Sequence, residues 1–185
     1  MNRIQIMTLH ALLAAFILPV AIMFTLTGSL YSWGIKGSYE DTKHTIALSE
    51  PIKADLVQLT ELAKAEMQNI GKSKPEGKPS VKKGGNSFWL EWTGSSKDIS
   101  LKPTKNSLEA QLTVKDTTAY RRFVQLHKAK GGQAFKVYAV IFSVAIVLLL
   151  ISGFIMAWQT PKLKHLTILA SLTGFVSFIV FVLLS

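Results

Sequence analysis

The sequence predicts a membrane protein with three transmembrane α-helices and one small α+β module, and three observations lead to this prediction. Apolar runs without a formally charged residue cover 11–30, 137–158 and 166–184. At a rise of ~1.5 Å per residue, such runs suit a hydrocarbon core ~30 Å thick. Of the 21 Lys and Arg, only Arg3, Lys162 and Lys164 lie outside 34–136, which also holds all 11 Asp and Glu. Within this charged stretch, the apolar residues change from helical spacing to alternation.

The first apolar run is predicted to be a retained anchor. Arg3 precedes it, as a basic residue precedes the core of a signal peptide, but the run is too long for that core and lacks an A-x-A cleavage site. The second and third runs are predicted to form a hairpin, in which Pro161 ends one helix and Lys162 and Lys164 lie in the turn. The segments are therefore 1–33 as a transmembrane helix, 34–135 as the module and 136–185 as a transmembrane hairpin.

Basic residues in short loops predict the orientation, because long loops cross the membrane largely regardless of charge. Arg3, Lys162 and Lys164 place the N-terminus and the hairpin turn in the cytoplasm. The module and the C-terminus are then outside. We expect a multi-pass protein in contact with membrane lipid.

The module is predicted to be a helix packed on an antiparallel meander. Apolar residues recur at helical spacing over 56–70, and Gly71 and Pro75 follow. Three later segments, 88–92, 99–101 and 108–114, alternate apolar and polar residues between Gly-, Ser- and Pro-containing turns. Alternation places Trp89 on the face opposite the core. The expected core is Leu56, Leu59, Met67, Phe88, Leu90, Trp92, Leu108 and Leu112.

An amphipathic helix is predicted over 117–128, with Tyr120, Phe123, Val124 and His127 on one face. Two interpretations are open. The helix lies in the membrane interface with its basic side towards lipid headgroups, or it packs on the meander.

Several function classes are excluded. The chain has no cysteine, which rules out disulfides, thiolate nucleophiles, cysteine-ligated zinc and iron–sulfur clusters. It has no phosphate-binding loop, no serine-hydrolase elbow and no H-E-x-x-H, and no acid lies within a span to relay protons. Glu40 and Asp41 are interpreted as a solvated loop, and the basic stretch 72–83 as a linker that could contact a partner. Basic and acidic residues are interleaved in the module, so the net charge of +10 does not indicate nucleic-acid binding. No catalytic residue is predicted.

One motif occurs twice. Leu26-Thr27-Gly28 near the end of the first span corresponds to Ile151-Ser152-Gly153 near the end of the second. Each span is preceded by a Leu-His pair, ending in His10 and in His127. Because the two spans run in opposite directions, the repeat is inverted. Small residues permit close approach of helices, so we predict packing contacts at Gly28, Gly153 and Gly174.

These elements resemble the PepSY-associated transmembrane family of bacterial inner-membrane proteins, over most of 9–158. The resemblance implies an extracytoplasmic PepSY module, a helix on an antiparallel sheet, and a location in the bacterial inner membrane. Larger members include ferric-siderophore reductases in which transmembrane histidines bind haem. The resemblance therefore implies that His10 and His127 are candidate axial ligands.

The predicted topology separates His10 from His127 by most of a bilayer, ~30 Å, so they cannot ligate one haem within a monomer. His165 opens the third span at the level of His10, and His44 follows the first span near the level of His127. The candidate bis-histidine pairs are therefore His10 with His165 and His44 with His127. The alternative is that these are ordinary interfacial histidines.

Two functions remain open. In the first, the protein is not an enzyme and has no cofactor, and its module binds or restrains another membrane or extracytoplasmic protein through Trp89, Lys82 and Lys83. In the second, it binds haem b as a transmembrane electron-transfer subunit related to ferric-siderophore reduction and iron uptake. A homodimer, or a further helix from another chain, is compatible with both.

Overall fold

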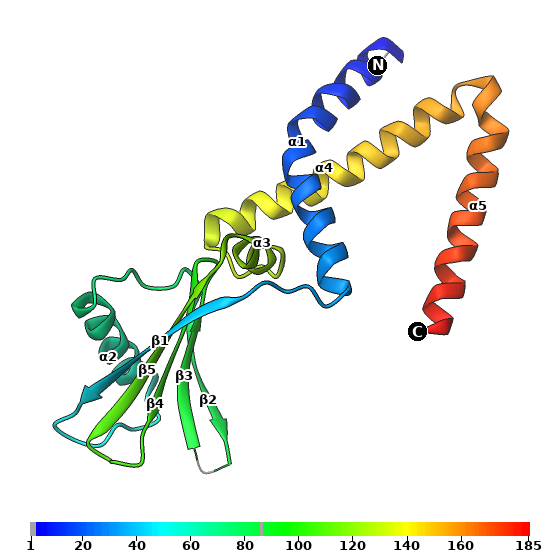
Figure 1. The fold of residues 1–185 in the computed structure, drawn as a ribbon. Helices are drawn as coiled ribbons and strands as arrows, with labels where there is room; N and C mark the ends of the chain where they lie inside the picture. Colours follow the sequence, from blue (N-terminus) through cyan, green and yellow to red (C-terminus); the bar gives the residue numbers. More distant parts are fainter. Residues whose placement is uncertain (1–2, 86) are drawn as a thin grey trace. The chain divides into compact units, whose positions relative to one another are not determined.

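The computed structural model describes residues 3–85 and 87–185 and contains three long apolar helices, one five-stranded sheet and two shorter helices (Figure 1). The chain divides into two compact units, which are described separately. One contains Met1–Ile22 and Ala139–Ser185, and the other is Met23–Tyr138.

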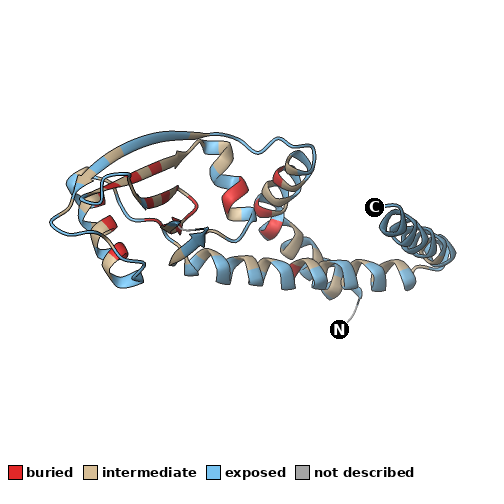
Figure 2. Cartoon of the chain, turned by 90° about the horizontal axis from the view of Figure 1, so that it is seen from below, coloured by how far each residue is buried: buried red, intermediate tan, exposed pale blue. Residues whose placement is uncertain are grey.

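Three helices are long and apolar enough to cross a membrane, as predicted: α1 (Arg3–Ser32), α4 (Gln133–Trp158) and α5 (Pro161–Leu184). In the first unit, the N-terminal part of α1 lies against α4, and Ile17, Val20 and Ala145 are buried there. The helix α5 buries none of its residues, and most of it has the pale blue of exposed residues in Figure 2. Outward-facing apolar side chains of this kind require lipid or another protein as their solvent.

The connection between α4 and α5 differs from the prediction. Pro161 does not end α4 but begins α5, where its missing N–H costs no hydrogen bond. Lys162 and Lys164 therefore lie in the first turn of α5 rather than in the connection, and the Lys164 ammonium lies 5.1 Å from the ring centre of Trp158. Arg3 Nη2 donates a hydrogen bond to Thr160 Oγ1 at 3.1 Å, so the start of α1 and this connection lie at the same end of the unit.

The second unit contains an antiparallel sheet in the order β1-β5-β4-β3-β2. Its strands are β1 (Tyr39–Ala47), β2 (Pro79–Gly84), β3 (Ser87–Thr93), β4 (Lys97–Pro103) and β5 (Glu109–Thr117). Strands β3 to β5 form the expected meander, to which β2 adds a further strand, and β1 pairs with β5 along its whole length, from Tyr39 opposite Thr117 to Ala47 opposite Glu109. The strand that follows the first membrane helix therefore meets the strand that precedes α3 (Ala119–His127).

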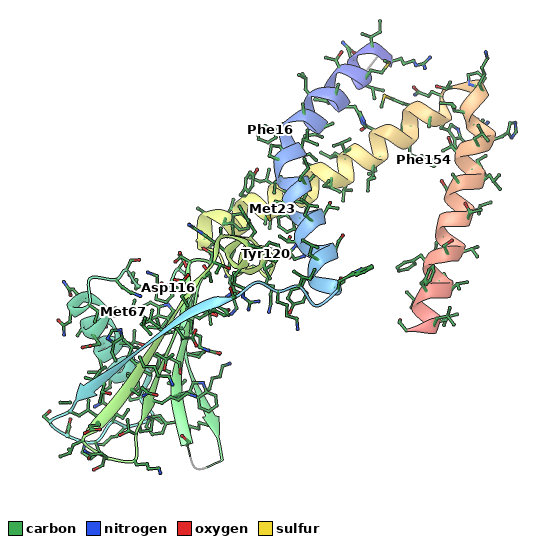
Figure 3. The ribbon with its side chains drawn as sticks, in the orientation of Figure 1. Phe16, Met23, Met67, Asp116, Tyr120 and Phe154 are labelled. Atoms are coloured by element: carbon green, nitrogen blue, oxygen red, sulfur yellow. The ribbon has the colours of Figure 1, made fainter. Side chains whose placement is uncertain are left out.

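One face of the sheet is covered by α2 (Leu56–Asn69), and the core lies between them. The Asp55 carboxylate caps α2 by accepting a hydrogen bond from the Gln58 backbone N–H at 2.7 Å. In Figure 3, the Met67 side chain extends from α2 towards the strands. Leu59, Met67, Leu90, Trp92 and Leu112 are buried and Phe88 is partly buried, as expected; Ile99, Leu101, Ala110 and Val114 complete the buried cluster on the sheet.

Two predicted core residues are wrong. Leu56 is 44% exposed because it is the first residue of α2, and Leu108 is 46% exposed because it precedes β5 in the turn. The interpretation of Glu40 and Asp41 as a loop is also wrong, since both lie in β1. Lys82 and Lys83 lie in β2 and not in a linker. Both missed strands are sheet edges, where charged side chains are common and the alternation of apolar residues is weak.

Candidate functional sites

His10 of α1 contacts the second copy of the repeated motif, on α4. Its Nδ1 lies 2.9 Å from Ser152 Oγ, and its Cε1 would be 3.5 Å from a methyl group added at Gly153. A side chain at position 153 would thus meet the imidazole. A methyl group fits here in ordinary van der Waals contact, while a larger side chain would displace the imidazole, and the packing role of Gly153 stays a prediction.

His127, the last residue of α3, contacts the first copy of the motif, on α1. Its Nδ1 lies 2.9 Å from Thr27 Oγ1, and its Cε1 and Nε2 would be 3.2 and 3.8 Å from a methyl group at Gly28. The ring of Phe24 packs on the same imidazole, with centroids 4.9 Å apart. Each histidine therefore binds the hydroxyl, and covers the glycine, of the opposite copy of the motif.

The hydroxyl groups assign the same tautomer to both histidines. Ser152 Oγ donates to the Leu149 carbonyl at 3.0 Å, and Thr27 Oγ1 donates to the Met23 carbonyl at 2.6 Å. Because a hydroxyl has a single hydrogen, each oxygen is left as the acceptor for the imidazole. We therefore assign the proton to Nδ1, which leaves Nε2 with a lone pair, the form in which a histidine ligates a metal when its other nitrogen is hydrogen-bonded.

The two histidines differ in burial and in the grooves beside them: His10 is partly buried and His127 is exposed. A groove of about 430 Å³ lies beside His10, and apart from His10 and Ser152 its lining is apolar: Ile6, Leu9, Leu13, Leu148, Ile151 and Ile155. The Nε2 of His10 is not among the atoms close to Gly153, whereas the ring of His127 lies with Nε2 as well as Cε1 towards Gly28. The groove beside His127 is smaller, about 330 Å³, and includes Lys128. Of the two histidines, which share this tautomer, His10 lies beside the larger and more apolar groove.

The other predicted site residues lie elsewhere. His165 is exposed on α5, and the hydrogen bond of His10 goes to Ser152 and not to His165. His44 lies in β1 opposite Leu112, on the face of the sheet that α2 covers, while the contacts of His127 in the described part of the chain are with Phe24, Thr27 and Gly28. Among the described residues, neither predicted histidine pair makes a direct contact, and both pairings stay predictions. A methyl group at Gly174 would meet no atom within 4 Å.

A polar cluster fixes α3 to the open face of the sheet, the face not covered by α2. Asp98 Oδ2 accepts hydrogen bonds from Tyr39 Oη at 2.8 Å, from Gln125 Nε2 at 3.1 Å and from Lys130 Nζ at 3.3 Å. Gln125 is fully buried, and Arg121 Nη2 donates to Tyr39 Oη at 2.9 Å. Burial raises the pKa of Tyr39, and the Asp98 carboxylate raises it further, against the opposing effect of Arg121. Of the two interpretations of this helix, packing on the module is observed, and the interfacial position stays a prediction; Arg122 is exposed.

The open face also carries Trp89, which is half-buried there. The Lys102 ammonium lies 5.2 Å from its ring centre, and Lys82 is its partner across the β2–β3 ladder. Lys83 pairs with Phe88 and so belongs to the opposite face. A groove of about 310 Å³ runs beside Trp89 and includes Tyr39, Ser100, Lys102 and Lys115. Of the residues predicted to contact a partner, Trp89 and Lys82 therefore share one surface and Lys83 does not.

The comparisons agree with this architecture. The family model for the PepSY-associated TM region matches residues 1–160. The chain belongs to this family. Neither the curated proteins nor the solved structures gave a match.

In this PepSY-associated protein, sequence reasoning missed the two hydroxyl groups that orient the histidines. The signal was present, because Thr27 and Ser152 occupy equivalent positions in the inverted repeat. His10, near the start of α1, reaches the copy near the end of α4, while His127, at the end of α3, reaches the copy near the end of α1. The repeat in the sequence indicates the residues and the inversion, and the structure adds which residues are in contact.

Proposed function

We propose that this PepSY-associated membrane protein binds haem b at His10 and serves as a transmembrane electron-transfer subunit related to ferric-siderophore reduction and iron uptake. The observation that carries the proposal is the hydrogen bond between His10 and Ser152, beside an apolar groove of about 430 Å³. This bond favours the tautomer with an unprotonated Nε2, which is the axial ligand that haem iron requires.

The residues that line the groove beside His10 fit a haem group. A porphyrin needs an apolar slot and one or two imidazole nitrogens, and the groove offers six aliphatic side chains and one histidine. Bound haem would supply one-electron transfer. His10 would hold the iron, Ser152 would keep the imidazole oriented, and the aliphatic side chains would exclude water. His127 is not part of the proposed site, because it is exposed and the groove beside it is smaller and includes Lys128.

The test is the Soret band of the full chain, purified in detergent after growth with iron and a haem precursor. We expect a haem band in the wild type, its loss in His10→Ala, and its retention in the matched variant His127→Ala. Ser152→Ala should keep haem but shift its reduction potential, since only the orientation of the ligand is changed.

The second axial ligand is tested by the same spectra. The sequence-based pairing predicts that His165→Ala converts a low-spin, six-coordinate haem into a high-spin one. An unchanged low-spin spectrum would show that His165 is not the second ligand. A wild type without a Soret band, or a band that survives His10→Ala, would contradict the haem site.

The proposal includes an orientation in the bacterial inner membrane, with the N-terminus in the cytoplasm and the module outside. The positions of Arg3, Lys162 and Lys164 support it. Because the chain has no cysteine, single cysteines can report it. We expect an impermeant thiol reagent applied from outside to label Lys105→Cys, an exposed position of the module, but not Lys162→Cys. The reverse labelling pattern would place the module in the cytoplasm.

A second candidate function is binding of another protein by the module. It is favoured by Trp89, an aromatic side chain beside a groove on the face of the sheet that α2 leaves open. Trp89 does not belong to the core. Its substitution should therefore reduce binding of a partner without unfolding the module.

A further inference from the structure

We propose that Tyr31, Lys36 and Lys128 form a binding site for the phosphate headgroup of an anionic phospholipid, with Arg122 and Lys136 adding to the attraction. All of these residues belong to the second unit. The site is independent of the proposed haem at His10.

The charge of the flanking segments is the first observation. Residues 23–38 and 118–138 contain six Lys and Arg and no Asp or Glu: Lys36, Arg121, Arg122, Lys128, Lys130 and Lys136. Two of these cations are engaged, since Lys130 pairs with Asp98 and Arg121 donates to the Lys36 carbonyl and to Tyr39. In the described part of the chain, the other four have no carboxylate within ion-pair distance.

Two of the four unpaired cations converge on one ring. The Lys36 and Lys128 ammonium groups lie 5.4 and 5.5 Å from the centre of the Tyr31 ring, although they come from different segments. Two like charges held around one aromatic ring repel each other in a medium of low dielectric. An anion placed with them would remove this repulsion and provide the missing partner for both.

The third observation is the groove beside the ring. Tyr31 lines a groove of about 330 Å³ that includes Thr27, Gly28 and Val124 and has Lys128 among its walls. The groove begins on α1, a membrane-spanning helix, and Trp33, two residues after Tyr31, is 87% exposed. Ser32 and His127 complete the lining, so the groove joins apolar and polar walls at the end of a spanning helix. Bordered by lysines and aromatic residues, it fits a molecule with an acyl chain and a negative headgroup.

The experiment measures lipid binding by the full chain in detergent, using native mass spectrometry and the midpoint of thermal unfolding. The probes are dioleoyl phosphatidylglycerol, dioleoyl phosphatidylcholine and inorganic phosphate. We expect retention of phosphatidylglycerol and a raised midpoint, with little effect of the other two. Each lysine near a charged membrane surface contributes ~1 kcal/mol, so the double variant Lys36→Gln with Lys128→Gln should bind phosphatidylglycerol roughly thirty-fold more weakly.

The matched control removes two other lysines of the module, Lys53→Gln with Lys105→Gln, which are exposed and make the same change in net charge. It should bind as the wild type does. The variant Lys36→Arg with Lys128→Arg should restore binding, which separates loss of charge from misfolding. Equal binding of both lipids, or equal loss in the control, would overturn the proposal. Equal stabilisation by inorganic phosphate would also overturn it, because the site would then recognise a soluble anion.

Discussion

Replacing Trp92 with alanine is expected to lower the free energy of unfolding of the module by about 3–5 kcal/mol, the usual cost of truncating a large core aromatic residue. Trp92 is only 4% exposed and packs in the cluster between α2 and the sheet. Its Nε1 also donates to the Gly77 carbonyl at 2.8 Å, so truncation leaves a partly buried acceptor without this partner. Hydrogen exchange of the β4 and β5 amides in the full chain, followed by mass spectrometry, measures the change.

Trp89→Ala is the matched comparison, three residues away on the other face of the same strand. We expect it to cost less than about 1 kcal/mol, because its side chain is partly solvated and lies over Lys102 rather than in the core. If the second candidate function holds, proteins that co-purify with the wild type should be lost from Trp89→Ala and retained by Lys105→Ala. Equal destabilisation by Trp89→Ala and Trp92→Ala would show that both faces of the sheet are buried, and would remove Trp89 as a binding residue.

The central strands and the membrane helices could be predicted because burial imposes a period on them. Strands β3, β4 and β5 each bury one face, so apolar residues recur at every second position. The edge strand β1 could not be found in this way. Its residues Glu40, Asp41 and Lys43 are exposed, and its ladder pairs only with β5, which lies far away in the sequence. Such long-range pairing depends on the whole module. The nine residues of β1 therefore carry only a weak alternation of apolar and polar residues.

The residues of the candidate site could be predicted from the sequence, but their contact partners could not. The repeated Leu-His and hydroxyl-Gly elements indicated the two histidines and the two glycines. The expected partners were other histidines, since His165 and His44 lie near the right levels along the spans. In the structure the partners are hydroxyl groups, which orient an imidazole and do not share a metal with it. The depth of a residue in the membrane therefore limits which residues could be its contact partners. Helix packing then decides which of them it contacts.

Substituting the two motif glycines with leucine is expected to displace the histidines, whereas the same change at Gly174 is expected to do nothing. The imidazoles of His127 and His10 lie where the new side chains would begin, at 3.2 Å from the added carbon at position 28 and 3.5 Å at position 153. Overpacking of this kind typically costs ~1–3 kcal/mol. The midpoint of thermal unfolding in detergent should therefore fall for Gly28→Leu and Gly153→Leu, and haem binding should be lost in Gly153→Leu alone.

Substituting alanine at positions 28 and 153 tests the same contacts with a smaller side chain. At position 153, the added methyl group is in ordinary van der Waals contact with His10, so Gly153→Ala should leave both the unfolding midpoint and any haem band unchanged. At position 28 the contact is tighter and His127 must shift by a few tenths of an ångström, which Phe24 on the same ring resists. Gly28→Ala should therefore be less stable than Gly153→Ala. Two outcomes would contradict this expectation: the opposite order of stability, or a loss of stability in Gly174→Leu as large as in Gly28→Leu. Either would show that contact with the histidines does not decide which residues these positions accept, and that general packing on the lipid-facing surface does.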